Sequence, residues 1–184
     1  MRLPYQEPLT VLAPAEPVLP EPPRRGEPGG PPCTICTGSS RPPIWSDANW
    51  TLHPPAGSSL PGTVWLASRV HADSFADLPD SVAVTFGPVA ARVERAILGW
   101  GNFARIHVYR WGDGGAHFHA WFLPRPLGML DAEGMMLPLW EDVLPNRPDE
   151  ELLAAATAIG AAMDAGERIV PGSAGPERAG NVAG

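Results

Sequence analysis

Lysine is absent from this sequence. All thirteen basic residues of the 184-residue chain are arginine, and twenty acidic residues give a formal net charge of −7 at pH 7. Proteins that bind nucleic acid electrostatically usually carry a basic stripe, so this balance argues against a nucleic-acid partner. An arginine guanidinium binds a phosphate or carboxylate with two donors at once, and a small anionic ligand is therefore compatible with the composition.

The sequence also lacks long apolar runs. No segment approaches the roughly 18 consecutive apolar residues that a membrane helix needs. The first residues, MRLPYQEPLTVLAPAEP, are interrupted by proline and do not show the charged and apolar regions of a signal peptide. We therefore expect a cytoplasmic protein without a membrane partner, and the chain length suits one domain with a full core.

Proline and glycine are unevenly distributed. Twelve of the 24 prolines fall in residues 1–43, so we expect residues 1–32 to form an irregular arm that wraps the domain or stays mobile. Residues 33–125 are expected to form the core domain. Residues 126–184 are expected to form an extension with one helix and a glycine-rich tail that frays from Gly166 onward.

The core shows the residue patterns of an antiparallel sheet with helices. Aromatic and β-branched content predicts strands at residues 49–53, 63–68, 103–110 and 116–123. Helical spacing of apolar residues predicts helices at 80–98 and 149–165, with Gly87 and Pro88 delaying or kinking the first. The five residues WGDGG can close the last two strands into a hairpin. This order of elements predicts an α+β fold.

Two further features, one aromatic and one apolar, have a structural interpretation beside a functional one. Trp45, Trp50 and Trp65 can line a base or sugar pocket, but tryptophans on strands favour a core position. The Met- and Leu-rich segment 127–145 resembles an insertion. Its expected role is packing under the C-terminal helix, and a lid or a dimer contact is the alternative.

The last predicted strand, AHFHAWFL, carries two histidines. Strand alternation places His117, His119 and Trp121 on one face. Histidines at this spacing stand about 6–7 Å apart. They can be structural histidines hydrogen-bonded in the sheet, two ligands of one metal, or one ligand beside one catalyst.

The chain has only two cysteines, Cys33 and Cys36, in the sequence CTIC. In a reducing compartment this spacing favours half of a metal site or a redox pair over a structural disulfide. Tetrahedral zinc needs two further ligands, which must be histidine or carboxylate here. His71 follows the second strand directly, so His71 and one histidine of the hairpin can complete a Cys2His2 site.

The segments CTIC, LPGTVWLASRVH and HFHAWFLPRP, in this order from Cys33 to Arg125, resemble the zinc-containing branch of the histidine-triad (HIT) superfamily. That superfamily includes dinucleoside polyphosphate and nucleoside phosphoramidate hydrolases and galactose-1-phosphate uridylyltransferase. The resemblance covers about half of the chain. It implies an antiparallel sheet of about five strands with helices on one face, commonly as a homodimer.

The resemblance also implies roles for particular residues. It assigns a structural zinc ion to Cys33, Cys36, His71 and His117, with no open position for chemistry. It makes His119 the nucleophile that takes a nucleotidyl group onto a ring nitrogen. We therefore expect a zinc-stabilised hydrolase or transferase that acts on a nucleotide or another phosphoryl compound through a covalent His119 intermediate.

Donors for the phosphoryl oxygens are expected beside the histidines. Arg110 and Arg125 flank the predicted strand, and the backbone amides of Gly112, Gly114 and Gly115 precede it. Trp111 and Trp121 are the candidate aromatic residues of the pocket. We expect these residues to bind the substrate, although either arginine can equally be a solvated surface charge.

Three departures from the family pattern favour alternatives. Trp121 stands where the third histidine of the triad would be, and an indole offers only one donor. The Gln or Ser that relatives place before the motif is missing, and HPPAGSS replaces the acidic residue that many hydrolases direct to ribose. One alternative is an inactive phosphate- or nucleotide-binding protein with the same fold. The other is a metal-centred enzyme in which His117 and His119 are both ligands.

Overall fold

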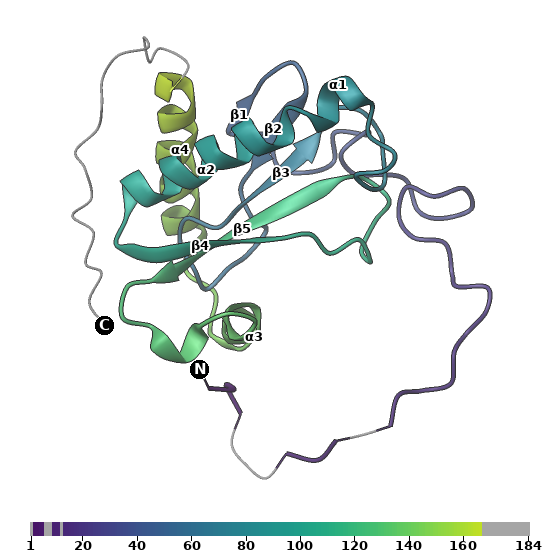
Figure 1. Ribbon diagram of the computed structural model, residues 1–184, viewed down its shortest axis with the longest axis horizontal. Coiled ribbons are helices and arrows are strands. Elements are labelled where there is room, and N and C mark those ends of the chain that lie inside the picture. The colour runs from purple at the N-terminus through teal and green to yellow at the C-terminus, as the bar shows by residue number, and fades with distance from the viewer. Residues whose placement is uncertain (1, 6–8, 12, 167–184) are drawn as a thin grey trace, which may run out of the picture.

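The computed structural model describes residues 2–5, 9–11 and 13–166. Five strands form one antiparallel sheet in the order β1-β2-β3-β5-β4 (Figure 1). They are β1 (Trp45–Ser46), β2 (Trp50–His53), β3 (Val64–Ser68), β4 (Phe103–Tyr109) and β5 (His119–Pro126). The α+β architecture expected from the sequence and the sheet of about five strands implied by the family resemblance are confirmed. The glycine-rich tail lies outside the described residues apart from Gly166, which ends the last helix.

Alternation along β5 separates the two faces of the sheet. Phe118, Ala120 and Phe122 are buried in the main core, whereas His119 and Trp121 are half-buried on the other face. The core face is covered by α2 (Phe86–Trp100) and α4 (Asp149–Gly166), the two main helices. Both supply side chains to the same core cluster: Val89, Val93, Ala96 and Ile97 from α2, and Ile159 and Met163 from α4.

The first predicted helix is split in two. Residues 80–83 form the single turn α1 (Asp80–Ala83), and α2 begins afresh at Phe86. Pro88 then falls in the first turn of α2, where its missing N–H would have no partner within the helix. The proline therefore decides where the long helix can start.

The segment 127–145 contains a helix that the sequence analysis does not predict. A short 3-10 helix η1 (Leu130–Ala132) is followed by α3 (Met136–Val143). Leu137 of α3 packs with Leu60 and Leu123 in a second, smaller cluster. Because Leu123 points away from the main core, this segment packs against the opposite sheet face and not under α4. Pro138 in the first turn of α3 obscures the helical pattern.

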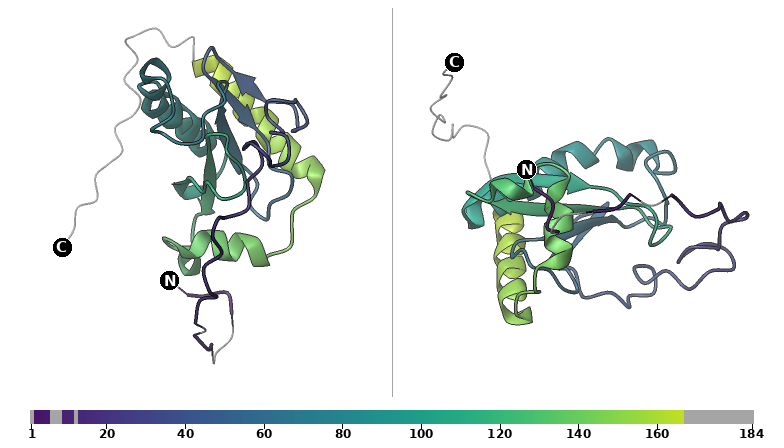
Figure 2. Two further views of the ribbon diagram at one scale, coloured as in Figure 1. Left: turned by 90° about the vertical axis from the view of Figure 1, so that its right-hand side faces the viewer. Right: turned by 90° about the horizontal axis from the view of Figure 1, so that it is seen from below.

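The described part of the N-terminal arm contacts the domain near both of its ends. The Trp140 indole N–H donates to the Arg2 carbonyl oxygen, and the Arg2 amide donates to the Asp131 carbonyl oxygen. Figure 2 shows the arm running outside the sheet from the neighbourhood of α3. It reaches the β4–β5 connection at Arg25, which bridges to Gly115. Among the described residues, no helix combines the length and the apolar character needed to cross a bilayer.

Two helical glycines form a matched pair that tests the packing of α4. An alanine methyl at Gly99 of α2 would meet nothing within 4 Å, whereas one at Gly160 of α4 would overlap the Ile44 carbonyl oxygen. We expect Gly99→Ala to raise the free energy of unfolding by about 0.5 kcal/mol, because alanine is the better helix former. Gly160→Ala should lower it by about 1–3 kcal/mol through overpacking. Urea unfolding of both variants measures the difference, and equal stabilisation by the two would contradict this packing.

Candidate functional site

The connection between β4 and β5 is longer than the five-residue turn predicted from WGDGG. β4 ends at Tyr109 and β5 begins at His119. The residues just before β5 are bound to segments other than β4. The Ala116 amide donates to the Arg25 carbonyl oxygen at 2.8 Å, and the Phe118 amide donates to that of Ala72. These long-range partners hold His117 beside the end of β3 instead of in a hairpin.

Four side chains converge at this point. The donor atoms of Cys33, Cys36, His71 and His117 all lie within 4.8 Å of one another. The His117 Nδ1 atom is 3.3 Å from the Cys33 Sγ atom and 3.5 Å from the Cys36 Sγ atom. The His71 Nδ1 atom is 3.3 Å from both the Cys36 Sγ atom and the His117 Nδ1 atom. The structure thus brings together the four residues that the sequence analysis selected as ligands.

The cluster fits a tetrahedral zinc ion. Ligand bonds of about 2.3 Å to sulfur and about 2.05 Å to nitrogen place two nitrogens about 3.4 Å apart and a sulfur about 3.6 Å from a nitrogen. The His117 Nε2 atom lies 2.8 Å from the Ser68 carbonyl oxygen, so Nε2–H donates and Nδ1 is free to bind a metal. Burial also lowers the pKa of His117, which favours the neutral imidazole that a metal requires.

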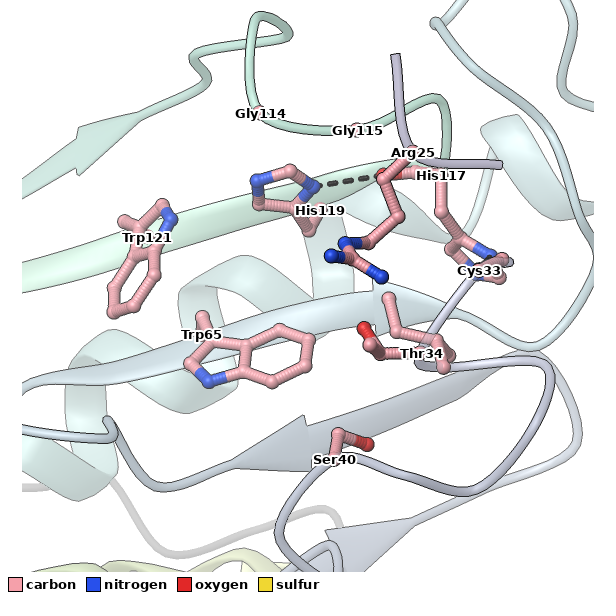
Figure 3. A pocket seen from close by; sticks show the side chains of 11 residues that line it. Arg25, Cys33, Thr34, Ser40, Trp65, Gly114, Gly115, His117, His119 and Trp121 are labelled. Atoms are coloured by element: carbon pink, nitrogen blue, oxygen red, sulfur yellow. Dashed lines mark hydrogen bonds between the residues drawn. The ribbon is translucent and has the colours of Figure 1, made fainter. Parts of the chain in front are cut away.

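His119 is held in a different way and lies outside this four-residue cluster. Its Nδ1 atom lies 2.7 Å from the His117 carbonyl oxygen. A carbonyl oxygen only accepts, so Nδ1–H donates and the lone pair of the imidazole is on Nε2. Figure 3 shows the ring at the edge of a pocket, with this hydrogen bond on the side of the ring nearest His117. The backbone carbonyl partner expected for a nucleophilic histidine is therefore present.

The pocket beside His119 has a volume of about 270 Å³. Trp65 and Trp121 are directly paired across β3 and β5, with ring centroids 6.1 Å apart, and they form an aromatic wall. The edge of Trp65 approaches His119 at 6.3 Å between ring centroids. Trp45 and Trp50 are buried in the core as expected, but Trp65 lines the pocket.

The two arginines that were expected to bind the substrate lie elsewhere. Arg110 donates to the Asp73 carbonyl oxygen and stacks over Phe118 with its guanidinium 5.4 Å from the ring centroid. Arg125 is buried and donates to the Met129 carbonyl oxygen at 3.1 Å. Neither arginine lines the pocket.

Trp111 lines a second, smaller pocket of about 130 Å³ that also has Trp121 in its wall. Its ring stacks on Tyr109 with centroids 4.9 Å apart. Trp121 therefore lines both pockets. Gly114 and Gly115, the proposed amide donors, line the pocket beside His119.

Three polar residues of the pocket beside His119 were not predicted from the sequence, namely Arg25, Thr34 and Ser40. They belong to the arm and to the loop after Cys33, far from the histidines in the sequence. The adjacent arginines before the segment GEPGGPPC were the available signal for Arg25. No local pattern connects them to His119, because the approach is made by long-range hydrogen bonds.

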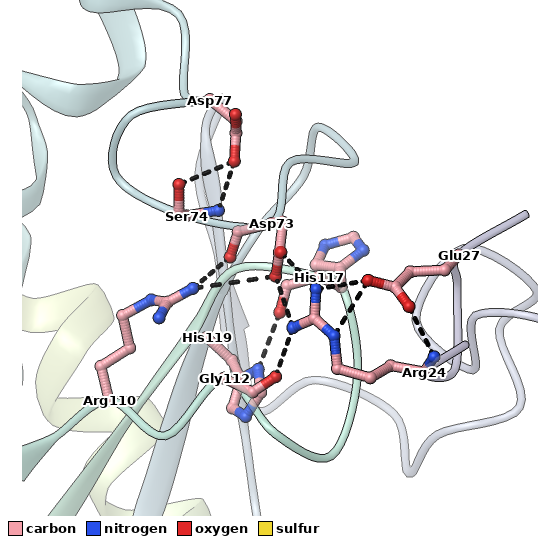
Figure 4. Close-up of polar contacts among 9 residues, drawn as sticks. All are labelled: Arg24, Glu27, Asp73, Ser74, Asp77, Arg110, Gly112, His117 and His119. Carbon is pink, nitrogen blue, oxygen red and sulfur yellow. Dashed lines mark hydrogen bonds and ion pairs between the residues drawn. The ribbon is translucent and has the colours of Figure 1, made fainter. Parts of the chain in front are cut away.

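Arg24 fastens the arm to the loop after His71 (Figure 4). Its guanidinium contacts the Asp73 carboxylate at 2.5 Å, the Glu27 carboxylate at 2.5 Å and the Gly112 carbonyl oxygen at 2.6 Å. The hydrogen bond from Arg24 lowers the pKa of Asp73. Asp73 thus bridges the arm and Arg110, whose Nη2 atom lies 3.9 Å from the same carboxylate.

The chain combines a Cys2His2 cluster, a pocket with an orientated histidine and a five-stranded antiparallel sheet. Its fold is similar to that of solved structures described as histidine-triad proteins. A Zn-bound histidine triad family protein from Mycobacterium smegmatis is 20% identical, with a TM-score of 0.54 over 73% of this chain and 93% of that one. A histidine triad protein from Bradyrhizobium japonicum is 15% identical, with a TM-score of 0.57 over 70% and 94%.

A third similar structure is described as a hypothetical histidine triad nucleotide-binding protein from Sulfolobus tokodaii. It is 12% identical, with a TM-score of 0.57 over 74% of this chain and 93% of that one. No protein-family model matches the sequence, and the comparison with curated proteins gives no match. The chain therefore has the histidine-triad fold, established by its structure at low sequence identity.

Proposed function

We propose that this protein is a zinc-stabilised enzyme that hydrolyses or transfers a nucleotidyl or related phosphoryl group through a covalent intermediate on His119. One observation carries the proposal. The Nδ1–H of His119 is bound to the His117 carbonyl oxygen, which leaves the Nε2 lone pair available at the pocket. A neutral imidazole orientated in this way is a competent nucleophile toward phosphorus.

The reaction would proceed by two displacements. The His119 Nε2 lone pair forms a bond to phosphorus as the bond to the leaving group breaks, and the electron pair of that bond departs with the leaving group. An amine leaving group takes a proton from water, whereas a phosphate leaves as its anion. Water or an acceptor hydroxyl then attacks phosphorus, loses its proton to solvent and restores the free imidazole. The His117 carbonyl would stabilise the positive charge on the substituted ring through the Nδ1–H bond.

Zinc bound by Cys33, Cys36, His71 and His117 would supply a structural crosslink, because four protein ligands leave no open position. The ligand His117 also provides the carbonyl oxygen that orients His119. Immobilising His117 would therefore fix the nucleophile as well as the loop. The two thiolates suit a reducing compartment, in accord with the cytoplasmic location expected from the sequence. The homodimer implied by the family resemblance is part of the same proposal.

The pocket wall supports a nucleotide or another aromatic phosphoryl compound as the substrate. Trp65 and Trp121 offer neighbouring aromatic surfaces next to His119, on which a base can stack. Pro54 and Pro55 stand where relatives would direct a carboxylate to ribose, so we expect weak discrimination at the sugar. The name of the Sulfolobus tokodaii protein, which includes nucleotide binding, is in keeping with this substrate class.

A specific observation favours a second candidate function, a binding protein without turnover. Trp121 lines the pocket in the position of the third histidine, and an indole N–H is a poor replacement for an imidazole beside a phosphoryl group. Binding of a nucleotide without reaction is the property that separates this candidate from the enzyme.

The covalent intermediate is tested by intact-mass analysis after incubation with nucleoside phosphoramidates and dinucleoside polyphosphates. We expect the wild-type protein to show turnover and a nucleotidyl adduct. His119→Ala should show no adduct and at least about 10³-fold lower activity, because the attacking atom is lost. His107→Ala is a matched control, since His107 is half-buried on the neighbouring strand and outside the pocket lining.

Two results would contradict the enzyme proposal. Turnover that persists in His119→Ala would remove the nucleophile assignment. Nucleotide binding by the wild-type protein without any turnover would favour the binding-protein alternative.

The zinc site is tested by metal analysis of purified variants. We expect stoichiometric zinc in the wild-type protein and in His119→Ala, and its loss in Cys36→Ser and His71→Ala. Chelation should lower the melting temperature of the wild-type protein and leave that of Cys36→Ser unchanged, because the crosslink is already lost there. Loss of zinc from His119→Ala would instead support the metal-centred alternative in which His119 is a ligand.

A further inference from the structure

Arg25 is the cation among the residues that line the His119 pocket. It belongs to the N-terminal arm, and its backbone carbonyl accepts a hydrogen bond from the Ala116 amide at 2.8 Å. The arm therefore enters the site as a strand-like partner of the β4–β5 connection. In Figure 3 the guanidinium lies between His119 and Thr34.

The charge of Arg25 is not neutralised by the described part of the chain. Its one side-chain hydrogen bond there goes to the Pro32 carbonyl oxygen, at 3.0 Å. The neighbouring Arg24 is the opposite case, because Asp73 and Glu27 both pair with it at 2.5 Å. Of these two consecutive arginines, Arg24 binds the arm to the domain, whereas Arg25 places a positive charge at the pocket.

The rest of the lining also favours an anion. Among the residues that the structure describes, no aspartate or glutamate lines this pocket, although the full chain has a net charge of −7. Thr34 and Ser40, which both carry a hydroxyl group, also line the pocket, and Figure 3 draws Thr34 nearer than Ser40 to the Arg25 guanidinium. Gly114 and Gly115 also line the pocket, where their backbone amides can donate to an anion. A cation without a counter-ion, flanked by small polar groups, is an arrangement that binds phosphate.

We propose that Arg25 is the phosphate-binding residue of the His119 pocket, and that the substrate is an anionic phosphoryl ester or amide bound between the Arg25 guanidinium and the His119 Nε2 atom. This inference rests on the proposed function and names the residue that supplies the charge. Arg25 would also supply the phosphoryl contact that Trp121, in the position of the third histidine, cannot make. The phosphoryl contact comes from the arm, not from Arg110 or Arg125.

Arg24 is the positioning residue in this arrangement. It holds the arm through Asp73 and the Gly112 carbonyl oxygen, and the compact turn after it is closed by a hydrogen bond from the Gly26 amide to the Pro31 carbonyl oxygen. Gly115 allows the arm to approach closely, because a β-carbon there would lie 3.3 Å from the Arg25 carbonyl oxygen. Releasing the arm would withdraw Arg25 from the pocket.

The test compares the full-length wild-type protein with Arg25→Gln, Arg25→Lys and the control Arg105→Gln, a second exposed arginine that does not line the pocket. Binding of inorganic phosphate, AMP and neutral adenosine is measured by calorimetry. We expect Arg25→Gln to weaken the binding of phosphate and AMP about tenfold, because a charge-assisted contact is lost. Adenosine affinity should not change. Arg25→Lys should recover part of the loss, and Arg105→Gln should match the wild type.

Ionic strength gives a second measurement. AMP affinity of the wild-type protein should fall as salt is raised, and this dependence should be weaker in Arg25→Gln because the screened charge is gone. Unchanged zinc content and melting temperature would show that the variant is folded. A variant that keeps wild-type affinity for both phosphate and AMP would overturn the assignment of Arg25 and leave the His119 reaction standing.

The results that would overturn the proposed function differ from those that would overturn the assignment of Arg25. Arg25-dependent binding of AMP without turnover would retain this inference and overturn the enzyme. A wild-type protein that binds neither phosphate nor AMP would overturn this inference, while turnover of a phosphoramidate in the same sample would preserve the reaction.

A double-mutant cycle tests the positioning role of Arg24. We expect Arg24→Gln to weaken AMP binding in the wild-type background but not in the Arg25→Gln background, because Arg24 acts through Arg25. Additive losses in the double variant would contradict this coupling.

Discussion

His117 makes three interactions through its side chain and its backbone. Both the four-residue cluster and the His119 pocket depend on them. The Nε2–H donates to the Ser68 carbonyl oxygen, the Nδ1 atom faces two thiols and a second imidazole, and the carbonyl oxygen receives the Nδ1–H of His119. The first two interactions require the His117 ring to carry its proton on Nε2, and the third requires the His119 ring to carry its proton on Nδ1. The end of β3 therefore orients the cluster residue, and the cluster residue orients the proposed nucleophile.

This arrangement explains why a structural metal site would stand next to the proposed nucleophile. A nucleophile gains from being held in one orientation before the substrate arrives. His119 is the first residue of β5, where its β-sheet pairing with Ala67 and its hydrogen bond to the His117 carbonyl oxygen restrain it. The residues just before β5 have no pairing with β4, so the four-residue cluster replaces the restraint that a tight hairpin would give.

The parts of this structure that follow from local periodicity could be predicted from the sequence. Alternation in AHFHAWFL separates a core face from a polar face, and the structure confirms that Phe118, Ala120 and Phe122 are buried. Cys33, Cys36 and His71 were also predictable, because zinc has few ligand types and the chain has few candidates. The choice of His117 as the fourth cluster residue came from the family resemblance. The fold class follows from the same patterns and from the resemblance they carry.

What could not be predicted depends on contacts between distant segments. The sequence distance between Arg25 and His119 gives no indication that they share a pocket, whereas Arg110 is close to His119 in the sequence and is occupied by Asp73. The predicted five-residue turn was too short for the same reason, because the Ala116 and Phe118 amides donate to the arm and to Ala72. Proline obscured α3, because Pro138 breaks the pattern while fitting the first turn.

The arm and the cluster meet at Gly26, so the two halves of the site adjoin one another. Gly26 follows Arg25 directly and lies against the cluster, where a β-carbon would be 3.1 Å from the His71 ring and 3.4 Å from Cys33. Its φ of +90° is one that residues with a side chain rarely adopt. The arm passes the cluster at Gly26 with no side chain between them. The cation and the nucleophile of the proposed site therefore both adjoin the four-residue cluster, Arg25 through Gly26 and His119 through the His117 carbonyl oxygen.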